Sequence, residues 1–163
     1  MSKEPSSPNT EGASPQAANA GAAAGAQRPA PTVASILGEI CWLYANLPGH
    51  RHYFIADLEW LVMPAIVNQQ FRIYRDGEGR PVGIVLWAKV DAEADKRLTE
   101  GHSRLRPDEW TGGDTVWIMD IADLSGGQRR QGILDDVKKV IFADTPIKYI
   151  ETEASGARQV RTI

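Results

Sequence analysis

The chain begins with a long segment that has almost no large apolar side chain. Residues 1–31 consist mostly of Ala, Pro, Ser, Gly, Asn and Gln, and their few charged side chains largely cancel. A segment of this composition cannot bury enough apolar surface to offset the conformational entropy lost on folding. We therefore expect a disordered tail over residues 1–31 and a single folded domain over residues 32–163. At about 130 residues, that domain is large enough to enclose one hydrophobic core.

An amphipathic helix is expected at the start of this domain. Thr32 or Ser35 can accept hydrogen bonds from the free amides of its first turn. The helix is expected to end at Pro48-Gly49, which places His50 directly after it. Trp42 lies off the apolar side of the helix, so it needs a second surface or a pocket to cover it. The apolar residues that recur at helical spacing are Val33, Ile36, Leu37, Ile40, Cys41, Tyr44 and Leu47.

Strands and helices are expected to follow one another through the rest of the domain. A helical segment interrupted at Pro64 is expected over residues 55–67, and a short helix over residues 91–99. A last helix follows the break at residues 125–127, and its buried side is expected to consist of Ile133, Leu134, Val137, Val140 and Ile141. Strands are expected over residues 70–74, 82–87, 115–121 and 147–153. Glycines within residues 75–81 indicate a hairpin turn between the first two strands.

Asp120 lies near the end of an apolar strand, where its carboxylate must find a hydrogen-bonding partner. Strict alternation along the strand would put Val116, Ile118 and Asp120 on one face and Trp117, Met119 and Ile121 on the other. The simplest interpretation of Asp120 is a cap at a strand end. The alternative is an acid that orients a catalytic base.

His50 has two interpretations as well. A histidine just past a helix end is often a surface or capping residue, and His52 lies only two positions further on. A histidine side chain with an ordinary pKa near 6.5 also suits proton transfer at neutral pH. His50 and Asp120 are therefore candidates for a general base and its orienting acid.

Charge and cysteine content exclude several classes of function. The net charge of −3 gives no reason to expect nucleic-acid binding, which usually needs a clustered basic face. The single cysteine, Cys41, excludes an internal disulfide framework and a cysteine-rich zinc site. No apolar run approaches the roughly 20 residues that cross a bilayer, and the N-terminus lacks the apolar core of a signal peptide. We expect a protein of the reducing cytoplasm.

Spaced Trp, Pro, His and Asp residues run through residues 33–153 in one order. They comprise Gly38, Trp42, Leu43, Pro48, His50 and Arg51, then residues 61–66 and Asn68-Gln69, and further on Pro81-Val82, Trp87-Ala88, Glu109-Trp110-Thr111, Gly113-Asp114, Trp117-Ile118 and Asp120. This set resembles the RTX protoxin-activating lysine acyltransferases of the hemolysin-activating type. Such a long ordered set is far more specific than any single short motif.

The resemblance implies a protein-lysine acyltransferase. Such enzymes move a fatty acyl group from acyl carrier protein to internal lysines of an RTX protoxin. Their proposed catalytic pair is the histidine after the proline and the aspartate after the Trp-rich strand, positions that His50 and Asp120 occupy here. The donor is a phosphopantetheine thioester on the carrier protein, so the resemblance implies no bound cofactor and no metal. The implied partners are acyl carrier protein and the protoxin, and a homodimer is compatible with the sequence.

The order of the expected elements resembles the GNAT-type acyltransferase fold. This is an α/β (α+β) fold in which helices flank a central, mostly antiparallel sheet. In that fold, amides of a glycine-containing loop at a helix start hold the donor phosphate, which makes Gly126 and Gly127 donor-binding candidates. Arg129 and Arg130 belong either to a solvated helix face or to a contact with an acidic carrier protein. Residues 128–133 match the glycine spacing of coenzyme A users only partly, which favours the carrier protein.

Two other functions stay open. A general GNAT-type acyltransferase would use acyl-coenzyme A, and it would need a loop that binds the coenzyme. A non-enzymatic toxin-binding chaperone is the second alternative, because Asp123-Leu124-Ser125 replaces the family's usual Pro-Phe and the C-terminus is shorter than is typical of the family. The presence of both His50 and Asp120 favours an enzyme. The sequence does not distinguish direct attack by lysine from an acyl-histidine intermediate.

Overall fold

A computed structural model describes residues 30–143, 145–153 and 155–163. The chain divides into two units, residues 1–30 and 31–163, and the description below concerns the second. The predicted tail over residues 1–31 lies outside the described residues, except for Ala30 and Pro31.

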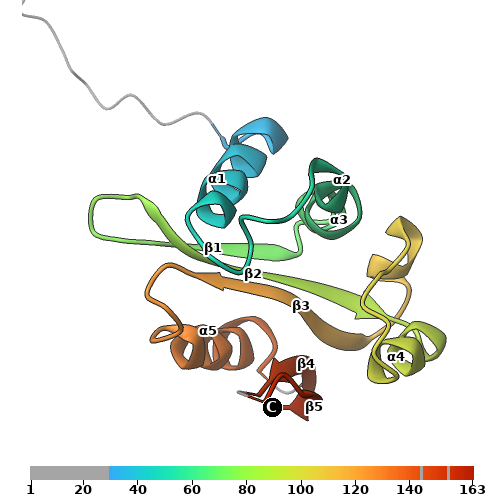
Figure 1. Ribbon diagram of the computed structural model, residues 1–163. Helices are drawn as coiled ribbons and strands as arrows, with labels where there is room; N and C mark the ends of the chain where they lie inside the picture. Colours follow the sequence, from blue (N-terminus) through green and yellow to red (C-terminus); the bar gives the residue numbers. More distant parts are fainter. Residues whose placement is uncertain (1–29, 144, 154) are drawn as a thin grey trace, which may run out of the picture. The chain divides into compact units, whose positions relative to one another are not determined.

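A five-stranded sheet forms the centre of residues 31–163, with its strands in the order β1-β2-β3-β4-β5 (Figure 1). The strands are β1 (Phe71–Arg75), β2 (Pro81–Val90), β3 (Thr115–Asp123), β4 (Ile147–Thr152) and β5 (Arg158–Thr162). Neighbouring strands are antiparallel except β3 and β4, which run parallel. The predicted fold class, a mixed α/β domain with a mostly antiparallel sheet flanked by helices, is confirmed.

One strand of this sheet was not predicted. β5 has the sequence Arg-Gln-Val-Arg-Thr and contains one apolar residue, Val160, so it carries no alternating apolar pattern. Its place comes from main-chain pairing with β4, in which Val160 lies opposite Ile150. The pairing makes β4 an inner strand.

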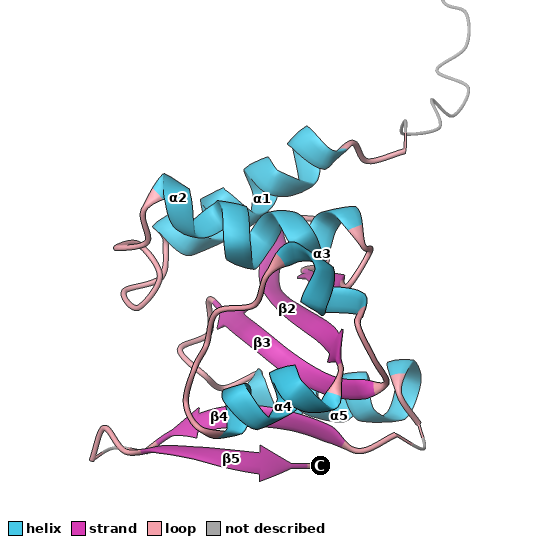
Figure 2. Cartoon of the chain, turned by 90° about the vertical axis from the view of Figure 1, so that its right-hand side faces the viewer, coloured by secondary structure: helices cyan, strands magenta, loops and turns pink. Residues whose placement is uncertain are grey.

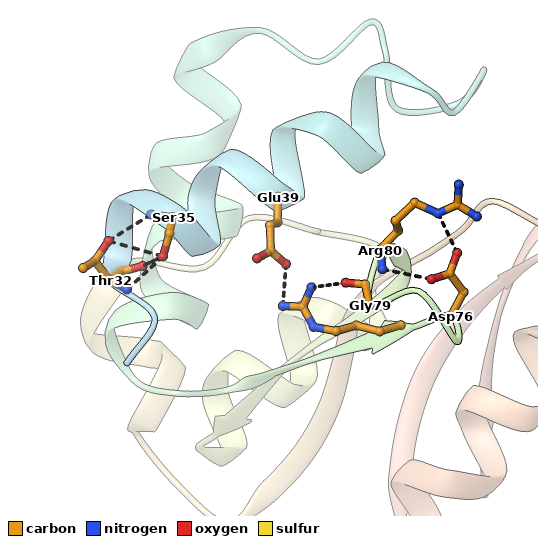
Figure 3. A network of polar contacts seen from close by, with 7 residues as sticks. Thr32, Ser35, Glu39, Asp76, Gly79 and Arg80 are labelled. Atoms are coloured by element: carbon orange, nitrogen blue, oxygen red, sulfur yellow. Dashed lines mark hydrogen bonds and ion pairs between the residues drawn. The ribbon is translucent and has the colours of Figure 1, made fainter. Parts of the chain in front are cut away.

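The first helix, α1 (Val33–Ala45), begins as the sequence predicts. Thr32 and Ser35 form a capping box, in which each side chain accepts a hydrogen bond from the other's amide. Figure 3 shows this cap together with Glu39, whose carboxylate binds the guanidinium of Arg75 at 2.7 Å. That ion pair joins α1 to the end of β1. The predicted hairpin turn after β1 is confirmed, because Asp76 accepts hydrogen bonds from two amides within it.

The remaining helices are short. The segment predicted over residues 55–67 is continuous but consists of three parts, α2 (Ile55–Asp57), the π-helical turn η1 (Leu58–Val62) and α3 (Met63–Val67), with Pro64 in the first turn of α3. Asp91 caps α4 (Ala92–Thr99), and a 3-10 turn, η2 (Pro107–Thr111), precedes β3. After β3 come α5 (Arg130–Asp136) and a second π-helical turn, η3 (Val137–Ile141).

Hydrophobic clusters lie on both faces of the sheet. On one face, residues of α1, η1, α3 and α4 pack against β2 and β3, and Ile40, Leu43 and Trp117 are almost fully buried there. On the other face, α5 and η3 contribute Ile133, Leu134 and Val137. Figure 1 shows α1, α2 and α3 on the opposite side of β2 and β3 from α5. Val140 was predicted on the buried side but is 63% exposed, because the wider turn of η3 breaks the 3.6-residue period.

A bulge in β3 corrects the predicted alternation of its side chains. Asp120 pairs with Leu86 and Ile118 with Trp87, so Met119 has no partner on β2. The extra residue reverses the side-chain alternation beyond it. Ile121 therefore packs with Val116 and Ile118 in the cluster against α5, while Asp120 faces α1 on the side of Trp117. The prediction that Asp120 shares a face with Val116 and Ile118 was wrong.

Candidate functional site

His50 is held in a tight turn that follows α1. The helix ends at Ala45, earlier than the predicted end at Pro48-Gly49, and the side chain of Asn46 caps it by donating to the carbonyl oxygen of Trp42 at 2.8 Å. The carbonyl oxygen of Leu47 then accepts hydrogen bonds from the amides of His50 (3.1 Å) and Arg51 (2.9 Å). Since Leu47 is itself buried, the turn is anchored to the core and His50 has a defined position.

The structure brings His50 and Asp120 together, as the sequence predicted. Nε2 of His50 lies 3.0 Å from Oδ1 and 3.1 Å from Oδ2 of Asp120. The two residues are 70 positions apart in the chain, and both are mostly buried. Because the bulge at Met119 turns Asp120 toward α1, the carboxylate meets the histidine and not the core around α5.

The contact assigns different tasks to the two nitrogens of His50. Nε2 faces the carboxylate, so it carries the proton that Asp120 accepts. Nδ1 is then the nitrogen left to accept a proton from another molecule. A negative charge beside the ring stabilises the imidazolium that forms. The arrangement therefore has the chemistry of a general base.

Two tyrosines complete the surroundings of His50. The ring of Tyr44 lies 4.7 Å from the imidazole ring and that of Tyr53 lies 5.3 Å from it, measured between centroids. Burial, followed by the nearby Asp120 charge, raises the pKa of Tyr44 well above its usual value. The same causes, in the same order, raise the pKa of Tyr53 to about 12. Both phenols are therefore protonated at neutral pH and can donate hydrogen bonds.

A cleft of about 560 Å³ opens beside this pair, where β3 and β4 part. The two strands pair only from Val116 and Ile147 to Ile118 and Tyr149, although both continue further. Figure 2 shows β3 and β4 separating toward their arrowheads. The cleft is lined by residues 118–121 of β3, residues 149–152 of β4, and His50, Tyr53, Leu98, Ser103, Trp117, Arg130 and Arg158.

An aspartate of α4 stabilises the edge of the cleft at which β3 and β4 begin to part. Asp95 accepts a hydrogen bond from the indole of Trp117 at 2.7 Å and from the ammonium of Lys148 at 2.8 Å. Burial alone would raise the pKa of Asp95, but these hydrogen bonds and the charge of Lys148 lower it. The three residues join α4 to the middle one of the three pairs between β3 and β4. They hold the strands together just before the cleft opens.

Of the four residues predicted to bind the donor, only Arg130 reaches the cleft. Its guanidinium carbon lies 6.0 Å from the ring centroid of Tyr149, which also lines the cleft. Gly126 and Gly127 lie in the preceding loop with φ of +69° and +95°, a conformation that favours glycine. These two residues and Arg129 do not line the cleft. Their part in binding the donor stays a prediction.

The loop before α5 donates hydrogen bonds to a carboxylate of the chain itself. Asp123, at the end of β3, accepts hydrogen bonds from the Ser125 amide at 2.9 Å, the Ser125 hydroxyl at 2.5 Å and the Arg129 amide at 3.0 Å. Burial alone would raise the pKa of Asp123, but these hydrogen bonds lower it. The amides of Ser125 and Arg129, on either side of the predicted phosphate-binding residues Gly126 and Gly127, are thus already occupied. An aspartate two residues before a serine is a common turn signal, and it could have indicated this role.

Sequence reasoning missed three other residues of the site. Tyr44 was assigned to the apolar side of α1. The helical spacing of apolar residues gives no sign that its hydroxyl has a hydrogen-bonding partner outside the helix. Tyr53 lies in the turn after His50 and has no motif. Arg158 comes from β5, the strand without an apolar pattern. Trp87, Glu109 and Trp110 are buried and do not line the cleft.

No three His, Cys, Asp or Glu side chains within residues 30–143, 145–153 and 155–163 lie close enough to hold a metal ion. None of the helices in those same ranges combines the length and the apolar character that a membrane crossing requires.

Comparisons with known proteins found a family model and several relatives. A family model described as the RTX toxin acyltransferase family (HlyC) matches residues 30–163. The RTX-II toxin-activating lysine-acyltransferase ApxIIC of Actinobacillus pleuropneumoniae is 38% identical over 86 residues, which are 53% of each chain. The lysine-acyltransferase RtxC of Vibrio cholerae is 29% identical over 112 residues, covering 68% of this chain and 71% of the relative.

A further relative and a solved structure also align with parts of the chain. The leukotoxin-activating lysine-acyltransferase LktC of a Pasteurella haemolytica-like species is 37% identical over 86 residues, and the chain spans about half the length of relatives such as this one and ApxIIC. Among solved structures, the crystal structure of histone acetyltransferase HPA2 and related acetyltransferase from Corynebacterium glutamicum aligns with a TM-score of 0.42. The identity is 15%, over 77% of this chain and 76% of that one.

Proposed function

Because the chain belongs to the RTX toxin acyltransferase family, we propose that it transfers a fatty acyl group from acyl carrier protein to internal lysines of an RTX protoxin. The observation that carries this proposal is the contact between His50 and Asp120 at the mouth of a cleft between β3 and β4. Family membership supports the substrate classes. The contact supports the catalytic roles of the two residues.

In the proposed reaction, His50 is the general base. A lysine amine has an ordinary pKa of about 10.4 and attacks a thioester only in its neutral form. Nδ1 of His50 removes the amine proton as the nitrogen bonds to the thioester carbon. The carbon–sulfur bond then breaks, and His50 returns the proton to the departing thiolate. Asp120 keeps the imidazole oriented and stabilises its positive charge between these two steps.

Tyr53 is proposed to donate a hydrogen bond to the thioester oxygen. That oxygen becomes negative as the tetrahedral intermediate forms, and hydrogen-bond donors placed around it lower the barrier. The Tyr53 side chain lines the cleft beside His50, and its pKa of about 12 keeps the hydroxyl protonated at the pH of the reaction. Tyr53 also touches both aromatic rings of the site, which fixes its position.

The phosphopantetheine arm of the donor is assigned to the cleft. β3 and β4 offer main-chain groups there that are not paired with each other, and an amide-containing chain can bind to them. Carrier protein is favoured over coenzyme A as the donor because Asp123 occupies the Ser125 and Arg129 amides, which reduces the capacity of the loop for a diphosphate. Arg130 at the cleft and Arg129 beside it are positioned to meet an acidic carrier.

The proposed location is the cytoplasm, where the single thiol of Cys41 stays reduced. Transfer needs one copy of the chain, since His50 and Asp120 come from the same chain. A homodimer is therefore not required for the chemistry.

The proposal is tested by expressing an RTX protoxin together with the wild-type protein, with His50→Ala or with His52→Ala. His52 is the matched control, because it is an exposed histidine two positions away. Mass spectrometry of the protoxin lysines should show acylation with the wild type and His52→Ala, and none with His50→Ala. Acylation by the His50→Ala variant would show that His50 is not the general base. Toxin activation without any lysine modification would identify a chaperone.

A further inference from the structure

Tyr44 makes the shortest contact that Asp120 has. Its hydroxyl donates to Oδ2 of the carboxylate at 2.5 Å, from the last turn of α1 and from a position 76 residues earlier in the chain. The side chain is 4% exposed, so water does not compete for this hydrogen bond. Asp120 therefore receives two donors, Tyr44 from the helix and His50 from the turn that follows it.

We propose that Tyr44 is a positioning residue, whose hydroxyl fixes the Asp120 carboxylate and takes up part of its charge so that His50 presents Nδ1 to the substrate. This inference rests on the proposed function, in which His50 acts as the base. It adds Tyr44, which lies in the last turn of α1, to the pair formed by His50 and Asp120.

The Tyr44 hydroxyl determines how the Asp120 carboxylate is oriented. His50 Nε2 is almost equally far from the two oxygens, at 3.0 and 3.1 Å, so its own contact does not select one rotation of the carboxylate. The Tyr44 hydroxyl contacts Oδ2 alone. A strong hydrogen bond to one oxygen fixes the plane of the group, and the imidazole is then held in one orientation. The Tyr44 ring also packs against His50 at an interplanar angle of 31°.

The Tyr44 hydroxyl also affects how strongly Asp120 stabilises a protonated His50. A hydroxyl that donates to a carboxylate draws on the same negative charge that stabilises the imidazolium. Removing the Tyr44 hydroxyl should therefore make the protonated ring more stable. His50 would then release its proton only at higher pH.

Several other groups act on the same histidine. On its own side of the cleft these are Tyr53, Cys41 and Arg51. From across the cleft, Glu151, Arg158 and Arg130 contribute charges. None of them changes in a Tyr44→Phe variant, so a shift in that variant reports the lost hydroxyl.

The chain supplies a matched control for that variant. Tyr74 in β1 donates its hydroxyl to Oδ2 of Asp136 at 2.8 Å, which is the same kind of hydrogen bond far from His50. Tyr74→Phe therefore removes an equivalent bond without touching the site. Thermal midpoints of the two variants would show whether they lose similar stability.

The first experiment measures acyl transfer against pH with an acylated carrier protein and a protoxin fragment. We expect Tyr44→Phe to move the acid side of the kcat profile upward by about one pH unit and to lower the plateau on the order of tenfold, with KM for the carrier unchanged. Tyr74→Phe should keep the wild-type profile. A Tyr44→Phe profile that overlays the control would overturn the proposal.

A second experiment needs neither substrate nor activity. The NMR signal of the His50 ring should titrate at a higher pH in Tyr44→Phe than in Tyr74→Phe. The wild type should also show a slowly exchanging, downfield hydroxyl proton that disappears in Asp120→Asn. Unchanged titration and no such proton would refute the role of Tyr44. Absence of acyl transfer by the wild type, with these signals present, would refute the proposed function and leave the hydrogen-bonded triad intact.

Discussion

Replacing Asp120 by asparagine tests the core of the proposed chemistry. The carboxylate accepts from two donors, the Tyr44 hydroxyl at 2.5 Å and His50 Nε2 at 3.0 and 3.1 Å. Asparagine has one acceptor oxygen and one amide donor, so it can accept fully from only one of them. If the amide faces His50, it favours the ring tautomer that carries its proton on Nδ1. The nitrogen needed as the base is then blocked.

The expected fall in kcat follows from the loss of the Asp120 charge and of the correct His50 tautomer. With the orienting acid uncharged and the ring in the wrong tautomer, kcat should fall on the order of 10²- to 10⁴-fold. That corresponds to roughly 2.7–5.4 kcal/mol of transition-state stabilisation. Donor binding in the cleft does not use the Asp120 charge, so KM for the carrier protein should change little. The substitution keeps the size of the side chain, which preserves the packing around it.

Single-turnover acyl transfer from carrier protein to a protoxin fragment measures the chemical step alone. Asp136→Asn is the matched control, because Asp136 also accepts a tyrosine hydroxyl, from Tyr74, and lies outside the site. The control should react at the wild-type rate. A rate for Asp120→Asn within about threefold of the control would reduce Asp120 to a structural cap, since loss of an orienting acid costs far more.

Three further predictions concern packing, acid stability and the donor. Gly113→Ala should destabilise the fold by roughly 3 kcal/mol in urea unfolding, because the added Cβ would lie 2.4 Å from a main-chain oxygen of β2. Gly112→Ala, whose added Cβ would have its nearest contact at 3.6 Å, should destabilise the fold far less. Equal losses of stability in the two variants would contradict this account. Asp95 has a pKa that is lowered, against the effect of burial, by hydrogen bonds from a lysine and a tryptophan, so its contribution is present at neutral pH and is lost as the pH falls below about 4. Asp95→Asn should therefore flatten the loss of thermal stability in that range, and an unchanged acid slope would speak against it. Arg129→Glu combined with Arg130→Glu should raise KM for the carrier more than it lowers kcat, and rising salt should weaken wild-type transfer; salt-insensitive turnover with acyl-coenzyme A would favour the general acyltransferase.

Local features of the sequence determined much of the fold. Thr32 and Ser35 cap α1 as predicted, because both partners lie within one helical turn. The hairpin after β1 and the start of α4 also formed as predicted, since Asp76 and Asp91 bond to amides only a few residues away. His50 and Asp120 were named from their places after a helix and near a strand end, and from a family resemblance carried by residues whose order is visible in the sequence.

The tertiary structure decided how these parts combine into a site. The bulge at Met119 depends on pairing with β2, and it alone determines that Asp120 faces α1. The hydrogen bond from Tyr44 spans 76 residues, so the helical period that placed Tyr44 in the apolar side of α1 gave no sign of it. Likewise, β5 has too few apolar residues to be recognised and exists because β4 offers it a main-chain edge. Sequence patterns record contacts between near neighbours, whereas side-chain partners from distant elements are settled only when the strands pair and the helices pack.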